Sequence, residues 1–105
     1  MTVKLIYDVV YDTRDLFEEN GNTYLVEVGL LYHDMVEEGK IIDYSFEQYP
    51  ETLTRTNTIT YVDMAARNEH RDRYQLIHQE NIVVTGRTIT NTYLEDENGV
   101  RTLLV

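Results

Sequence analysis

Apolar and polar residues alternate along much of the chain, and a period of two is the pattern of a β-strand with one buried face. Residues 2–11 are rich in β-branched and aromatic residues, and the alternation places on one face Val3, Leu5, Tyr7 and Val9. Two later segments alternate in the same way. In residues 22–32 the residues on one face are Tyr24, Val26, Val28 and Leu30. In residues 40–49 they are Ile42, Tyr44 and Phe46. All three segments are predicted strands.

Glycine and proline mark the predicted turns between these strands. Asn20-Gly21 favours a tight hairpin turn, because both residues tolerate positive φ. Glu38-Gly39 predicts a second turn, and Pro50 interrupts the ladder that follows. Residues 29–38 allow another interpretation, a short helix that ends at Gly39 as its cap. We favour the hairpin, because apolar residues continue in strand-like order on both sides.

Threonine occupies every second position between Thr52 and Thr60, which predicts another strand, since a helix would scatter these side chains around its axis. Residues 55–61 and 87–93 also share the pattern Arg-Thr-x-Thr-x-Thr-Tyr. Seven residues are too few to indicate a duplicated domain. We interpret the similarity as two strands of one sheet that each present an exposed threonine row, whose members would pair across the strands if the two were neighbours.

Asp63 is the predicted N-cap of a helix over about residues 63–79. The centre of this segment, residues 67–73, is entirely polar, so only the ends of the helix are expected to contact a core. A break near Asp72, with an extended segment after it, is the alternative.

The last predicted unit is a hairpin in which residues 81–95 form a strand, Asn98-Gly99 turns the chain, and residues 100–105 return. Together the elements predict a single α+β domain over residues 1–105. It is mainly β, with about six antiparallel strands in a curled sheet or small barrel and one helix over about 63–79. A chain of 105 residues has room for one hydrophobic core.

The composition bears on the cellular location of this domain and on the chemistry available to it. The chain has no cysteine, which excludes disulfides and thiolate chemistry. Together with a start at Met1 that does not resemble a signal peptide, this favours a cytoplasmic location. No apolar run approaches the roughly 18 residues that a membrane span requires.

The charge is strongly negative and unevenly distributed. The formal net charge is −10. Residues 1–50 contain 11 acidic and 3 basic side chains, a net charge of −8, whereas residues 51–105 have a net charge of −2. Such a surface repels phosphate backbones and disfavours direct nucleic-acid binding, but it attracts a basic partner.

Acidic and aromatic side chains of the first half are therefore the predicted contacts with a partner protein: Glu18, Glu19, Tyr32, Asp34, Glu37, Glu38 and Asp43. Basic side chains gather in one place only, within the predicted helix. They are the predicted contacts with a phosphate or with the acidic half of another copy: Arg67, His70, Arg71 and Arg73. Glu69 and Arg73, four residues apart, favour a surface ion pair, so an ordinary solvated helix face is the competing interpretation.

No pattern indicates catalysis, and no catalytic residue, metal site or cofactor is predicted. His70 and His78 are eight residues apart, about 12 Å along a helix, too far to share a metal. Ser45 is the one serine and lies in a predicted strand without a poised base. The five glycines are dispersed, so there is no phosphate-binding loop.

Three functional hypotheses follow. The leading one is an acidic protein-interaction module, in its sharpest form a nucleic-acid mimic of the phage anti-defence type, which inhibits a partner by occupying its basic surface. Carboxylates at every second residue of a strand lie about 7 Å apart, close to the spacing of phosphates along a nucleic-acid strand. The alternatives are a structural subunit of a homo-oligomeric or virion-like assembly, and a small enzyme or ligand-binding barrel.

Overall fold

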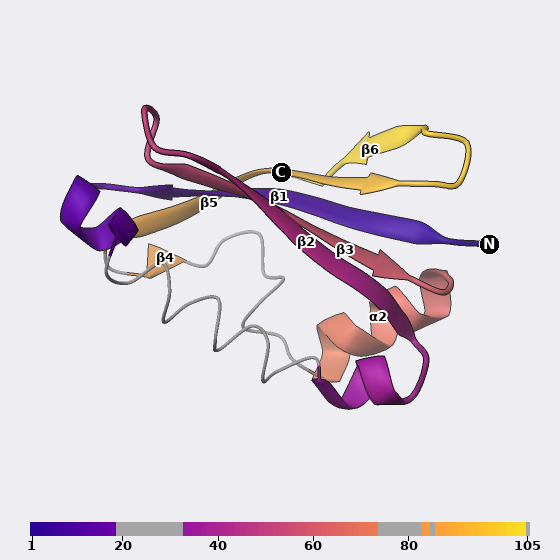
Figure 1. Cartoon of the computed structure of the whole chain (residues 1–105). Coiled ribbons are helices and arrows are strands. Elements are labelled where there is room, and N and C mark those ends of the chain that lie inside the picture. The colour runs from indigo at the N-terminus through magenta and orange to yellow at the C-terminus, as the bar shows by residue number, and fades with distance from the viewer. Residues whose placement is uncertain (19–32, 74–82, 85, 105) are drawn as a thin grey trace.

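The computed structural model describes residues 1–18, 33–73, 83–84 and 86–104 (Figure 1). Within these residues six strands form one sheet: β1 (Val3–Tyr11), β2 (Ile41–Tyr49), β3 (Thr54–Tyr61), β4 (Val83–Val84), β5 (Arg87–Glu95) and β6 (Arg101–Leu103). The longest described helix is α2 (Met64–Arg73), and residues 14–18 and 33–37 are also helical. No helix in the described part of the chain has the length and apolar character needed to cross a membrane.

Every strand pair is antiparallel, in the order β2-β3-β1-β5, and both β4 and β6 pair with β5. The central strand is β1, whose Leu5 lies between Ile59 of β3 and Leu94 of β5. The sheet does not close into a barrel. A mainly β α+β fold with antiparallel strands is therefore confirmed, in its curled-sheet form.

The core lies between the sheet and the helices, which cover one of its faces (Figure 1). Alternate side chains of β1 are buried, which confirms the predicted face: Val3, Leu5, Tyr7, Val9 and Tyr11. Ile59 and Tyr61 of β3 join them, and the helical segments contribute Phe17, Met35 and Ala66. The opposite face carries half-buried polar residues and no described helix.

The two threonine rows lie on that opposite face but are not neighbours, because β1 separates them. Asp8 of β1 is the register partner of Thr56 on one side and Thr90 on the other. Its carboxylate accepts a hydrogen bond of 2.6 Å from the Thr56 hydroxyl and one of 3.1 Å from Asn91 Nδ2. The second row is interrupted at Asn91, where φ is +49° and the register shifts, so that Thr92 is buried.

The hairpin predicted over residues 29–38 is wrong in its described part. Residues 33–37 are helical, and Gly39, at φ +76°, ends the helix in the left-handed conformation. The amide of Gly39 donates to the Val36 carbonyl (3.0 Å) and that of Lys40 to the Met35 carbonyl (2.9 Å), the bonding expected of a glycine cap. The strand predicted over 22–32 and the Asn20-Gly21 turn lie outside the described residues.

In residues 51–105 the structure largely agrees with the elements predicted from the sequence. The Asp63 cap is confirmed, because the Ala66 amide donates to Asp63 Oδ1 (2.8 Å). The predicted strand over 81–95 is divided into β4 and β5, which pair with each other because the chain reverses near Gly86, at φ +85°. The hairpin of β5 and β6 is confirmed, with Gly99 at φ +81°. Of the predicted helix 63–79, residues beyond Arg73 lie outside the described part.

The polar centre of α2 contacts the core, contrary to the expectation that only its ends would. Arg67 is 3% exposed and His70 is 0% exposed. The Tyr61 hydroxyl and His70 Nδ1 form a hydrogen bond of 2.7 Å beneath the helix. Burial, assisted by the nearby positive charges of Arg67 and Arg73, lowers the pKa of His70 to about 4. His70 therefore acts as a neutral, hydrogen-bonded core residue.

This burial predicts a loss of stability in mild acid. The pKa of this histidine is 6.5 in the unfolded chain and about 4 in the folded protein. Its contribution to the free energy of unfolding is therefore fully present above pH 6.5 and is lost as the pH falls toward 4. Between pH 6.5 and pH 5 the free energy of unfolding should fall by about 1.5 kcal/mol. Urea unfolding at a series of pH values measures it. His70→Gln should flatten the dependence, whereas the exposed control His33→Gln should retain it; an unchanged slope in His70→Gln contradicts the assignment.

Candidate functional site

The acidic residues predicted to bind a partner do not form one patch. Glu18 is exposed at the end of the helical segment 14–18, whereas Asp34 and Glu37 are exposed on the segment 33–37. These segments lie at opposite ends of the sheet (Figure 1). Asp43 is exposed on β2. Glu19 and Tyr32 lie outside the described residues.

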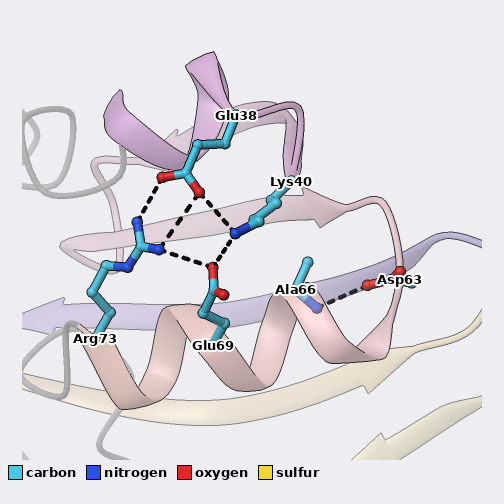
Figure 2. Close-up of polar contacts among 6 residues, drawn as sticks. All are labelled: Glu38, Lys40, Asp63, Ala66, Glu69 and Arg73. Carbon is cyan, nitrogen blue, oxygen red and sulfur yellow. Dashed lines mark hydrogen bonds and ion pairs between the residues drawn. The ribbon is translucent and has the colours of Figure 1, made fainter.

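Glu38 is held in a network of four alternating charges that joins the turn after residues 33–37 to α2 (Figure 2). Its carboxylate contacts Arg73 Nη1 at 2.9 Å and Lys40 Nζ at 2.8 Å. The Glu69 carboxylate contacts the same cations, Lys40 at 2.7 Å and Arg73 at 3.0 Å. Hydrogen bonds from Arg73 and Lys40 lower the pKa of Glu38 to about 2. Its charge is thus balanced within the fold.

The predicted basic cluster is divided among three environments. Arg67 and His70 are buried. Arg73 belongs to the charge network, where its pairing with Glu69 confirms the expected i,i+4 contact. Arg71 is exposed beside Asp72, at 3.3 Å. The four residues therefore do not share a surface that could grip a phosphate.

The other described cations are mostly engaged as well. Arg55 is 3% exposed, and its guanidinium lies 4.1 Å from the ring centroid of Phe17 and donates to the Phe17 carbonyl at 2.8 Å. Arg101 contacts the Glu95 carboxylate at 2.9 Å. Among the basic side chains that the structure describes, only Lys4 and Arg14 are exposed without an ion pair.

Four exposed acids lie on or beside two segments that contact each other, the helical segment 14–18 and the turn between β2 and β3, and we call this part of the molecule the acidic end. Two contacts hold these parts together: the Tyr11 amide donates to the Leu53 carbonyl at 2.9 Å, and Arg14 Nη2 donates to the Pro50 carbonyl at 3.3 Å. Figure 1 shows both segments at the same end of the sheet. Within the described residues none of these acids forms an ion pair: Asp12, Asp15, Glu18 and Glu51.

A pocket of about 310 Å³ opens at the acidic end, lined by Gln48, Tyr49, Pro50, Glu51 and Thr52. Tyr49 is 46% exposed, and its hydroxyl donates to the Glu47 carboxylate, which raises the tyrosine pKa. The residues that line the pocket thus include an aromatic residue and an acidic one. This is the chemistry that accepts a lysine or arginine side chain.

Sequence reasoning selected only Glu18 among the described acids of this site. Of the missed acids, Glu51 lies far in the chain from Asp12 and Asp15, and the bond from the end of β1 to Leu53 brings their two segments together. Within the described residues, no three histidine, aspartate or glutamate side chains converge as a metal site would require.

Comparison with protein-family models, with curated proteins and with solved structures found no match to this chain.

The charge network predicts a specific change in the titration of Glu38. Replacing Arg73 with methionine removes the strongest of its partners, so the pKa of Glu38 should rise from about 2 toward its ordinary 4.5. The stabilisation that this carboxylate contributes above pH 4.5 would then be lost at higher pH than in the wild type. Carbon-detected NMR titration of the Glu38 carboxylate measures the shift. Arg71→Met, on the same helix but outside the network, is the control; an equal shift in both variants contradicts the contacts.

Proposed function

We propose that the protein is an acidic protein-interaction module that binds a basic surface of a partner protein through its acidic end. One observation carries the proposal: the chain places most of its described cations in its core or in internal ion pairs, while four carboxylates at the acidic end form no ion pair and outnumber the one exposed cation described there, Arg14. The field near this end is therefore negative. Such a field accelerates encounter with a basic partner and repels acidic ones.

The pocket beside the acidic end supports a contact more specific than charge alone. Tyr49 offers a half-exposed ring and Glu51 an exposed carboxylate at its rim. A partner lysine or arginine that enters the pocket would gain an ion pair and a cation–π contact together. Tyrosine and arginine pairs of this kind often account for most of the affinity of an interface.

The partner class that fits best is a nucleic-acid-binding protein, because surfaces that bind phosphate backbones carry the densest positive charge. Carboxylates of the acidic end would take the place of phosphates, and the module would inhibit its partner by competing with nucleic acid. This finer form predicts that duplex DNA or RNA displaces the module.

The two alternatives have weaker support. A homo-oligomer joined through the helix cations would need Arg67 and His70 on the surface, and both are buried. An enzyme would need a reactive group placed against a base, and the described residues offer the buried Tyr61–His70 pair, which is closed to a substrate.

Charge reversal tests the proposal. The triple variant Asp12→Lys, Asp15→Lys and Glu51→Lys should lose the partner that the tagged wild type captures from a lysate at low salt. We expect affinity for the identified partner to fall by about 100-fold, because each lost ion pair is replaced by a repulsion. Isothermal titration calorimetry measures it, with folding checked by circular dichroism.

The matched control makes the same change of charge elsewhere, with Glu37→Lys, Asp72→Lys and Glu97→Lys, all exposed positions. It should bind nearly as well as the wild type. An equal loss in both variants would indicate a diffuse field instead of a site. Full binding by the first variant would refute the proposal.

A further inference from the structure

Within the residues that the structure describes, strand β2 forms a long free edge of the sheet. It comes first in the strand order and has nine residues, paired on one side with β3. The opposite edge is formed by the two-residue β4 and the three-residue β6. A free edge presents unpaired backbone N–H and C=O groups, which are a template for another extended chain.

The usual protection of an edge is absent from most of β2. Natural edge strands are guarded by lysine, proline or a bulge, and between Ile42 and Tyr49 there is neither lysine nor proline. The register shift lies between Ile41 and Asp43, at the beginning of the strand. Apolar side chains stay exposed along it, Ile42 at 55% and Phe46 at 40%.

The two faces of β2 differ in chemistry. Asp43, Ser45 and Glu47 pair with the threonines of β3 on the face without helices. Both acids are exposed and, in the described part of the chain, neither has a cation. They lie about 13 Å apart along the strand. Phe46 points to the other face, opposite Asn57 and with its ring centroid 6.2 Å from that of Tyr44.

We propose that the β2 edge binds an extended segment of a basic polypeptide as an additional strand. Side chains of an added strand alternate between the faces, so the segment would carry lysine or arginine at alternate positions, facing Asp43 and Glu47. Apolar residues between them would lie beside Phe46. Backbone hydrogen bonds supply affinity and the alternating charges supply selectivity. The inference rests on the proposed function only in taking the partner to be basic.

A second copy of the chain fits this edge less well. Antiparallel self-pairing centred on Ser45 would place Asp43 of each copy opposite Glu47 of the other, and like charges directly opposite destabilise a strand pair. Each copy also brings a net charge of −10. Charge complementarity therefore favours a basic strand as the occupant.

A ten-residue peptide of alternating lysine and valine is the probe, with a glutamate–valine peptide as its control. NMR titration of the full-length ¹⁵N-labelled protein should shift amide signals of residues 42–48 and slow their hydrogen exchange with the lysine peptide alone. Asp43→Lys combined with Glu47→Lys should weaken binding about tenfold, and Phe46→Lys should also weaken it by guarding the edge. The double variant Asp12→Lys and Glu51→Lys, with the same change of charge, should keep the β2 shifts.

The readouts separate this inference from the proposed function. If the lysine peptide shifts only signals of the acidic end, the module binds basic chains but the β2 inference is overturned. Equal binding of both peptides, or no shift in β2, also overturns it. If sedimentation shows a dimer whose β2 amides are protected without peptide, a second copy occupies the edge and the basic strand is wrong.

Discussion

The structure depends on β1, the central strand of the sheet, which is hydrogen-bonded to β3 along one edge and to β5 along the other. Its register positions β3 on one side and β5 on the other, so its alternation determines which residues of all three strands face the helices. Every second side chain from Val3 to Tyr11 is buried, and these five contribute the largest share of the apolar core. A shift of one residue would turn this set to solvent, so the register is strongly specified.

The buried and paired basic residues help to determine which charges remain on the surface of the fold. Arg55 lies against Phe17 and donates to its carbonyl, which attaches the helical segment 14–18 to β3. A buried cation therefore helps to position the acids of the acidic end. Arg67 is likewise buried, and Arg73 and Lys40 are balanced by Glu38 and Glu69. Most of the described basic side chains therefore help to hold the fold together, whereas many acidic side chains remain exposed and determine the charge of the surface.

Features that depend on local sequence were predictable. The buried face of β1, the Asp63 cap and the hairpin through Asn98-Gly99 each follow from a few adjacent residues, and the structure confirms them. The prediction for the segment 33–37 is wrong because so short a segment fits a strand of a hairpin and a helix that ends at Gly39 almost equally well. The glycine cap at Gly39 and the contact of Met35 with the core decide for the helix.

Features that depend on distant contacts were not predictable. The polar stretch of α2 suggested a solvated helix, yet the hydroxyl of Tyr61, nine residues earlier, provides the partner that allows His70 to be buried. The acidic end has the same origin, since the segments that carry Asp12 and Glu51 come together through the bond from the end of β1 to Leu53. Charge counts show that the first half of the chain is acidic, but only the fold determines that Glu38 is balanced by Lys40 and Arg73 while Asp12 and Asp15 form no ion pair among the described residues.

Net charge also bears on how the exposed β2 edge is tolerated. An edge with exposed Ile42 and Phe46 would ordinarily favour association of identical chains. Here every copy carries the same strongly negative charge, and Asp43 and Glu47 repeat that sign along the edge itself. Repulsion between copies thus replaces the lysines and prolines that guard other edges, and it disappears when the incoming strand is basic. Under the proposals made above, the acidity that repels a second copy is the same property that selects a basic partner.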